Sequence, residues 1–67
     1  MNYFGNRLKI LRLKHNLSQL QLARELHVSQ STISSWENGL SEPNIFKLVS
    51  VARFFKVSVD YLIGLKD

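Results

Sequence analysis

The chain has 67 residues, of which 45% are hydrophobic, and it contains no cysteine. This length allows one domain, spanning residues 1–67, and the lack of cysteine excludes disulfides, so the apolar side chains must form the core unaided. Nine Lys and Arg against five Asp and Glu give a net charge of +4 and a pI near 9.9, which favours a polyanionic partner without naming one.

No apolar run approaches the roughly 20 residues that a membrane-spanning helix needs, and no charged-then-apolar leader is visible. We therefore expect a cytoplasmic protein with no membrane partner. The sequence also lacks a Ser/His/acid or Cys/His arrangement, a glycine-rich phosphate cradle and a cluster of His with acidic residues. We expect neither an enzyme nor a metal site, a cofactor or a small-molecule substrate.

Every strong hydrophobic pattern has a helical period, which predicts an all-α fold. The first helix is expected over about residues 5–15, because Phe4, Leu8 and Leu11 recur at spacings of four and three. Asn16 then suits the left-handed residue that follows a helix. The basic residues of this segment form either a solvated face or a set of phosphate contacts, and both interpretations stay open: Arg7, Lys9, Arg12 and Lys14.

A second helix is predicted to begin at Ser18, which has the capping-box spacing to Gln21, and to end at His27. Its inward residues are Leu22, Ala23 and Leu26, where the small Ala23 allows a neighbouring helix to cross closely. Val28 fills the core, and Ser29 caps a third helix that ends at Gly39. The inward side of the third helix holds Ile33 and Trp36, with the indole N–H of Trp36 reaching the surface.

The second half of the chain predicts two more helices after a loop at residues 40–43. Asn44 caps the fourth helix, and Lys56 closes it. Ser58 caps a short fifth helix, which ends near Gly64. The inward residues are expected to be Leu48, Val49, Ala52 and Phe55 on the fourth helix, and Val59, Leu62 and Ile63 on the fifth.

Residues 18–38 thus predict two short helices joined by a tight turn, and residues 27–41 contain no Lys or Arg. A short helix with small hydrogen-bonding side chains near its start fits the DNA major groove, where base edges offer donors and acceptors. The alternative is that these polar residues only solubilise an exposed helix face.

Motifs along nearly the whole chain resemble the Cro/C1-type helix-turn-helix family, which is lambda-repressor-like. They are Arg7-Leu8-Lys9, Leu11-Arg12, Leu17-Ser18-Gln19, Leu22-Ala23, Val28-Ser29, Ile33-Ser34, Glu37-Asn38-Gly39, Pro43 and Val57-Ser58-Val59-Asp60-Tyr61-Leu62. The resemblance implies a compact five-helix domain in which helices 2 and 3 form the DNA-binding motif. The family commonly has glycine where this chain has Asn16 and His27, so both residues are expected at positive φ, at a cost of about 1 to 2 kcal/mol for His27.

The resemblance also places the third helix in the major groove. Its candidate DNA-facing residues are Ser29, Gln30, Ser31, Thr32, Ser34 and Ser35. Gln30 is the strongest candidate reader, because a glutamine amide can pair with the N6 and N7 edge of adenine, whereas serine hydroxyls discriminate less. Gln19 is implied to touch a phosphate while supporting Gln30.

Further phosphate contacts are expected from Asn38 and Asn44 without a full positive charge, and Lys9, Lys14 and Lys47 are candidate phosphate clamps. Arg12 and Glu37 are implied to form a partly buried structural ion pair rather than a DNA contact. His27 is expected to be a structural turn residue rather than a pH sensor or ligand, and His15 to be exposed.

The function implied by the resemblance is a sequence-specific regulator of transcription that binds double-stranded DNA. We expect a phage-type or mobile-element repressor of a bacterial or phage-infected cell, associated with the nucleoid and bound to a palindromic operator as a homodimer. Candidate dimer contacts are Val57, Val59, Tyr61 and Leu65. The alternative is an antitoxin or antirepressor that uses the same fold to mask a protein partner. The chain is either a complete Cro-like regulator or a domain of a longer repressor.

Overall fold

The computed structural model describes residues 3–67, and all regular structure in that range is helical. Five helices follow one another in the order α1 (Phe4–Lys14), α2 (Gln19–Leu26), α3 (Gln30–Glu37), α4 (Ile45–Phe55) and α5 (Val59–Ile63). The all-α, five-helix prediction is confirmed, and α1 begins and ends one residue earlier than expected. None of the described helices is long and apolar enough to cross a membrane.

Four of the five helices begin at the polar residues that the sequence predicts as N-caps. The side-chain oxygens of Ser18, Ser29, Asn44 and Ser58 each accept a hydrogen bond from the backbone N–H three residues later. At Ser18 the capping box is complete, because its own N–H donates to Gln21 Oε1 over 2.8 Å. These local bonds satisfy backbone donors that a helix start otherwise leaves open, and so fix where each helix begins.

The two predicted left-handed turns are both present, since Asn16 and His27 each have a φ of 57°. Lys56, which was expected only to close α4, adopts the same φ of 57°. At His27 and Lys56 the helix therefore ends in one left-handed residue, and the chain reverses sharply into the next N-cap two residues on.

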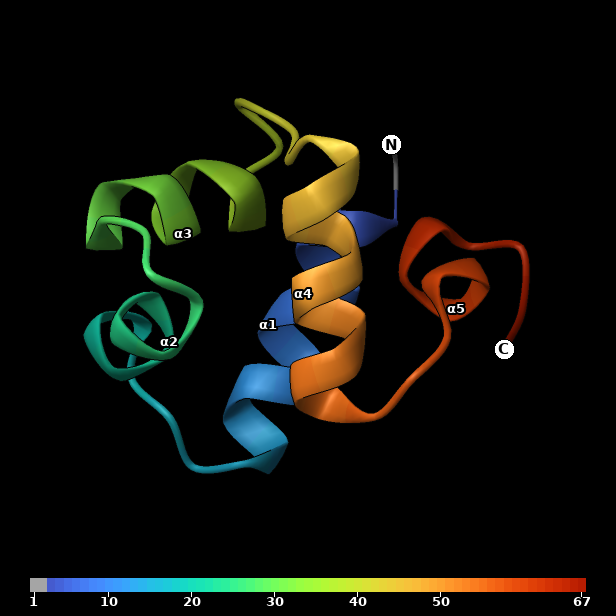
Figure 1. Cartoon of the computed structure of the whole chain (residues 1–67), viewed down its shortest axis with the longest axis horizontal. Helices are drawn as coiled ribbons and strands as arrows, with labels where there is room; N and C mark the ends of the chain where they lie inside the picture. Colours follow the sequence, from blue (N-terminus) through green and yellow to red (C-terminus); the bar gives the residue numbers. More distant parts are fainter. Residues whose placement is uncertain (1–2) are drawn as a thin grey trace.

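The helices form two groups around a central pair. In Figure 1, α4 passes in front of α1, the α2–α3 unit lies on one side of this pair, and α5 lies on the other with the C-terminus. The core draws on all five helices: Phe4, Leu8, Leu11, Leu22, Ala23, Leu26, Ile33, Trp36, Leu48, Val51, Ala52, Phe55 and Leu62. Val28, Val57 and Val59 pack against it while half-buried.

The inward face of α4 differs from the prediction at one position. Val51 is fully buried, whereas Val49, which was expected to point inward, is only half-buried. Counting three, four and seven residues on from Leu48 gives Val51, Ala52 and Phe55, which is the stripe that a period of 3.6 residues requires. Val49 follows Leu48 by one residue, or about 100° around the helix, and so falls beside this stripe.

The start of α1 packs very closely against the end of α3. The rings of Phe4 and Trp36 meet edge to face with centroids 5.9 Å apart, and both side chains are buried. Next to this contact Gly5 is buried, and a Cβ added to it would lie 2.3 Å from the carbonyl oxygen of Trp36. Gly5 therefore allows a backbone approach that no larger residue permits.

Candidate nucleic-acid interface

The α2–α3 unit has the form of a helix-turn-helix. Leu26 ends α2, His27 takes the left-handed conformation, and Ser29 caps α3 only two residues later. On the inner side of α3, Ile33 and Trp36 are buried in the core as predicted. Because this inner side is fixed by packing, the opposite side of α3 is held at a defined angle toward solvent.

Hydroxyl groups are linked to one another at the first turn of α3. Ser29 Oγ accepts from the Thr32 backbone N–H over 3.1 Å, and it also lies 2.8 Å from Thr32 Oγ1 and 3.0 Å from Ser31 Oγ. Gln30 and Ser31 are exposed, whereas Thr32 is half-buried. The first turn thus exposes the Gln30 amide and the Ser31 hydroxyl to solvent on a backbone held by the cap.

The predicted site residues nearer the end of α3 are less available. Ser34 and Ser35 are half-buried, and the Ser35 hydroxyl lies 2.7 Å from that of Ser41 in the following loop. The Asn38 amide is exposed and donates a long hydrogen bond of 3.4 Å to Ser34 Oγ. All the candidate residues of α3 therefore lie on the α2–α3 unit, but the exposed ones are mainly at the N-terminal end of α3.

The predicted ion pair between Arg12 and Glu37 is confirmed. Arg12 Nε donates to Glu37 Oε2 over 2.7 Å and Arg12 Nη2 donates to Oε1 over 3.1 Å, with the two side chains 10% and 3% exposed. A third bond runs from Arg12 Nη1 to the Leu17 carbonyl over 2.9 Å. The hydrogen bond to Glu37 raises the pKa of Arg12 above its ordinary value, so the guanidinium stays charged. The pair joins α1 to the end of α3.

Gln19 completes this network in a way that differs from the expectation. Its side-chain Nε2 donates to Glu37 Oε1 over 3.1 Å, so the hydrogen bond links Gln19 to the ion pair and not to Gln30. The bond is possible because the buried Glu37 carboxylate still has lone pairs open toward the start of α2. The bond thus joins the start of α2 to the end of α3.

Two further expected phosphate contacts are engaged within the protein. Asn44 Oδ1 accepts from the Lys47 backbone N–H over 2.9 Å, as the cap of α4. The Lys47 ammonium donates to the Leu26 carbonyl over 2.8 Å and so links α4 to the end of α2, which the sequence did not indicate. Lys9 and Lys14 are exposed on α1.

Arg7, the first residue of the predicted basic cluster, has a structural role. Its guanidinium lies 5.3 Å from the ring centroid of Tyr3 and 4.5 Å from that of Tyr61, and it donates to the carbonyls of Tyr61 and Lys66. Tyr61 thus contacts other parts of the same chain, and the half-buried Val57 and Val59 also pack against the core. Of the four residues expected at a dimer contact, Leu65 alone is largely exposed.

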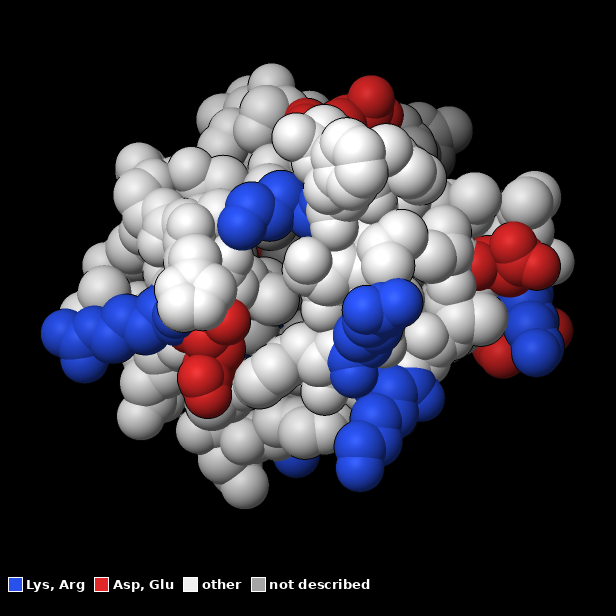
Figure 2. All heavy atoms as spheres, viewed as in Figure 1, with Lys and Arg blue, Asp and Glu red and all other residues white. Residues whose placement is uncertain are grey.

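Positive charge is separated from the candidate reading helix. Between Glu25 and Phe46 the chain has no Lys or Arg, and the one charged side chain of α3 is the paired Glu37. Figure 2 shows blue side chains over α4, beside α2 and between α3 and α4, while most of the surface over α3 is white. The surface that would face DNA therefore offers neutral amides, hydroxyls and backbone groups rather than cations.

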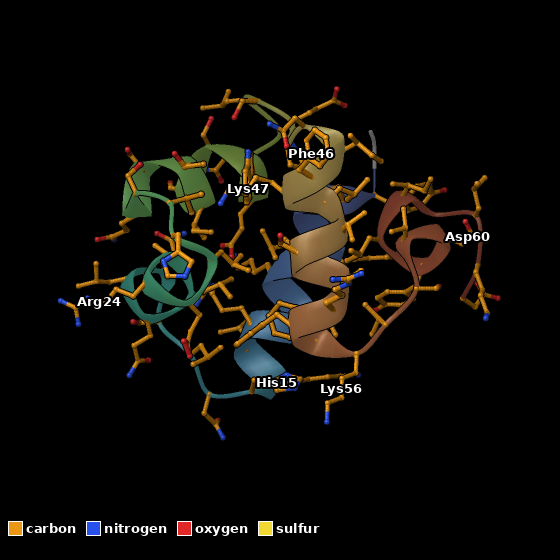
Figure 3. All side chains as sticks on the ribbon, viewed as in Figure 1. His15, Arg24, Phe46, Lys47, Lys56 and Asp60 are labelled. Carbon is orange, nitrogen blue, oxygen red and sulfur yellow. The ribbon has the colours of Figure 1, made fainter. Side chains whose placement is uncertain are left out.

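Sequence reasoning missed three exposed apolar side chains between α3 and the first turn of α4. Leu40 and Phe46 are each 79% exposed and Ile45 is 60% exposed. A signal for Phe46 exists in the sequence, because it precedes Ser50 by four and Arg53 by seven residues and so falls on the polar row of α4. The label in Figure 3 marks Phe46 at the start of α4, beside Lys47.

Comparison with known proteins gives consistent matches. A model of the helix-turn-helix family matches residues 8–62. Among curated proteins, the HTH-type transcriptional activator BcrR of Enterococcus faecalis is 43% identical over 91% of this chain, and the uncharacterized HTH-type transcriptional regulator YobD of Bacillus subtilis is 41% identical over 96%. The chain spans 30% of BcrR and 57% of YobD.

Among solved structures, the c2 repressor of Salmonella phage P22, in complex with a synthetic operator, superposes with a TM-score of 0.83 and 34% sequence identity. The match covers 88% of this chain and 89% of that one. Fold, motif and sequence agree, and the family consists of DNA-binding regulators rather than enzymes. The chain belongs to the Cro/C1-type helix-turn-helix family.

Proposed function

We propose that the chain is a sequence-specific regulator of transcription that binds double-stranded DNA by placing the N-terminal half of α3 in the major groove. One observation carries the proposal: Gln30 and Ser31 are exposed at the start of a capped helix whose opposite side is buried. A base-reading group needs a fixed position, because each misplaced hydrogen bond loses most of its discrimination. A DNA target would also place the protein with the nucleoid, in the cytoplasm.

Gln30 is the residue we assign to direct base reading. Its amide N–H can donate to N7 of adenine while its amide oxygen accepts from the N6 amino group, in a two-bond pairing worth about 1 to 3 kcal/mol of discrimination. Ser31 offers a hydroxyl that pairs less selectively, and the half-buried Thr32, Ser34 and Ser35 reach less far. Direct reading is thus concentrated near one end of α3, and DNA shape would supply the remainder of the specificity.

Phosphate contacts would flank this reading surface. Ser29 and Gln19 lie at the starts of α3 and α2, and Asn38 and Asn44 lie on either side of the α3–α4 loop. These side chains are neutral, so they would orient the domain on the sugar-phosphate backbone more than they would attract it. Attraction would come from the net charge of +4, carried by residues outside α3.

Two copies on a palindromic operator fit the dimensions of the domain. Its longest extent is 27 Å, which is shorter than the roughly 34 to 36 Å between half-sites one helical turn apart. One copy would therefore read one half-site, and a homodimer would read both. We favour repression of the phage or mobile-element kind, by occupation of the operator. A bound copy excludes other proteins from the same groove without needing a second surface.

A second candidate is a protein-interaction role of the antitoxin or antirepressor kind. It is favoured by the exposed Leu40, Ile45 and Phe46, because apolar side chains gathered beside a functional helix often mark a protein contact. Replacing all three with serine separates the candidates. If the protein acts by masking a partner, this variant loses its activity in the cell although its affinity for DNA is unchanged. If it acts as a regulator through Gln30, the variant keeps both its DNA affinity and its activity.

The decisive experiment is selection of bound duplexes from a random pool, followed by titration of the selected and a scrambled duplex at several salt concentrations. We expect a palindrome whose half-site spacing matches one helical turn, tighter binding to it at every salt concentration, and affinity that falls as salt rises. A pool that yields no preferred sequence, with equal affinity for both duplexes, would contradict the proposal.

A further inference from the structure

We infer that Lys47 is a positioning residue that sets the angle of the reading helix through the end of α2, rather than a clamp on a DNA phosphate. The inference rests on the proposed function, because its test measures DNA binding, but it is argued from contacts within this chain. Lys47 is half-buried, and its Nζ donates to the Leu26 carbonyl oxygen over 2.8 Å. Figure 3 shows the Lys47 side chain lying between α4 and the α2–α3 unit.

The Leu26 carbonyl needs a donor from outside its own helix. The chain turns left-handed at His27, so the His27 N–H points back to the carbonyls of Ala23 and Arg24, and the Val28 N–H points to Ala23. Those bonds satisfy earlier carbonyls of α2 and leave the Leu26 oxygen at the open C-terminal end. A lysine ammonium suits this position, because it supplies the donor and its positive charge faces the negative end of the helix dipole.

Lys47 is held at both of its ends. Its backbone N–H donates to the capping Asn44 Oδ1 over 2.9 Å, which fixes its place on the first turn of α4. Its ammonium, at the far end of the side chain, holds the residue just before the His27 turn. Since α3 starts only four residues after Leu26, any movement of Leu26 is passed on to Gln30. The lysine therefore connects the central part of the fold to the reading surface.

A phosphate clamp and an internal tether make different predictions about salt. Each phosphate that a protein neutralises contributes about 0.9 to the slope of log affinity against log salt on B-form DNA. Removing a clamp lowers this slope and weakens binding to all sequences alike. Removing a tether leaves the slope unchanged and weakens binding chiefly where α3 must fit the bases.

The test compares the variant Lys47→Met with two other variants, all made in the full chain. Lys47→Arg keeps the charge and a donor, and Arg53→Met removes an exposed charge from the same helix as a matched control. Binding to the selected and the scrambled duplex is measured by fluorescence anisotropy at four salt concentrations, at a temperature where circular dichroism shows each variant folded. Amide hydrogen exchange of Val28, without DNA, is the second measurement.

For Lys47→Met we expect at least a tenfold loss on the selected duplex, less than a threefold loss on the scrambled one and an unchanged salt slope. Val28 exchange should be at least tenfold faster, and Lys47→Arg should restore most of both effects. Equal losses on both duplexes with a slope smaller by about one would overturn the inference in favour of a phosphate contact. The inference would also be overturned if Arg53→Met lost affinity chiefly for the selected duplex, as expected for Lys47→Met. A Lys47→Met variant with a lower melting temperature but unchanged affinity would overturn it as well.

The exchange measurement separates this inference from the proposed function. If wild-type protein prefers no duplex, the proposed function fails, while faster Val28 exchange in Lys47→Met still supports the tether. If wild-type protein selects a palindrome but Val28 exchange does not change in Lys47→Met, the tether fails alone. Should Lys47→Met not fold, Lys47→Gln, which shortens the side chain and removes its charge, takes its place. The tether then predicts faster Val28 exchange in Lys47→Gln, and unchanged exchange in Lys47→Gln would overturn it.

Discussion

Gly5 lies so close to Trp36 that a Cβ on the glycine would sit 2.3 Å from the tryptophan carbonyl oxygen. The same Cβ would lie 2.9 Å from the Glu37 carbonyl oxygen, so the obstruction is backbone on both sides and cannot swing away. Gly5 thereby sets the distance between α1 and the last turn of α3, and it lies beside the Phe4–Trp36 ring contact. The close approach of Gly5 to Trp36 therefore affects both the stability of the domain and the position of α3.

Gly5→Ala should therefore destabilise the domain, although alanine normally favours a helix. The gain in helix propensity is about 1 kcal/mol, whereas forcing a methyl group into a closely packed site costs about 1 to 3 kcal/mol, and more where only backbone can yield. We expect a net loss of roughly 1 to 2 kcal/mol in the free energy of unfolding by urea. Asn6→Ala, exposed on the same helix, is the control and should be neutral or slightly stabilising. Equal stability of the two variants would contradict this close packing.

Removal of Glu37 should be among the most damaging single changes in the chain. Its carboxylate accepts bonds from Arg12 and Gln19 and its side chain is 3% exposed, so Glu37→Ala would leave the Arg12 guanidinium buried without its partner. We expect a loss of about 3 to 5 kcal/mol in the free energy of unfolding. Because that loss could unfold a domain of this size, Glu37→Gln is measured in parallel and should lose less, since it retains an acceptor.

The control for Glu37 is Glu25→Ala, which removes an exposed carboxylate from α2. Thermal unfolding followed by circular dichroism should show a shift of a few degrees at most for Glu25→Ala. Similar shifts for the two alanine variants would mean that the ion pair contributes no more than a surface charge.

Local features were predictable from the sequence, and contacts between helices were not. The cap at Ser29 and the left-handed turn at His27 depend on residues within four positions, so a single sequence encodes them. The close approach at Gly5, the tether of Lys47 to α2 and the ring contacts of Arg7 depend on how helices distant in sequence cross. For these three residues the sequence showed only that Lys47 and Arg7 are charged and that Gly5 is small, and not which helices they contact. The base and phosphate contacts remain predictions, because they need DNA to be observed.

His27→Gly should stabilise the protein, because the residue has a φ of 57° that only glycine adopts without steric cost. Relief of about 1 to 2 kcal/mol of strain is partly offset by the greater entropy of glycine in the unfolded chain, so we expect a net gain of about 0.5 to 1 kcal/mol. Glu25→Gly, at an ordinary helical position two residues earlier, is the control and should lose about 1 kcal/mol. A loss of stability in His27→Gly would show that the imidazole makes a contact that offsets the strain.

Arg7→Ala should lower stability without altering the salt dependence of DNA binding. The substitution removes the stacking on Tyr3 and Tyr61 together with the donors to the carbonyls of Tyr61 and Lys66, which together hold the chain's C-terminal segment against α1. We expect a loss of about 1 to 2 kcal/mol in urea unfolding. Lys9→Ala removes an exposed charge of the same sign from the same helix and should leave stability nearly unchanged. A reduced salt slope in Arg7→Ala alone would instead place Arg7 on the DNA.

Gln30→Ala tests the proposed reading of bases most directly. Gln30 is exposed at the start of α3, and its backbone is held by the Ser29 cap, so truncation should leave the fold intact. Losing a two-bond pairing of about 1 to 3 kcal/mol predicts a 5- to 150-fold lower affinity for the selected duplex. Affinity for a scrambled duplex and the slope against salt should not change, because phosphates do not engage this amide. Asn6→Ala, an exposed amide on α1, serves as the control.

The pattern of base preference then identifies where Gln30 acts. Each position of the selected half-site is replaced in turn by the other three bases, and binding is measured for wild type and Gln30→Ala. At one position of the half-site, wild type should prefer adenine, whereas Gln30→Ala should bind with similar affinity whichever base is present. At every other position both proteins should keep the same base preference. If the variant loses affinity equally for all duplexes, Gln30 contributes to the general contact with DNA, and the reading residue must be sought elsewhere on α3. Retained discrimination at every base would likewise move the assignment to Ser31, its exposed neighbour.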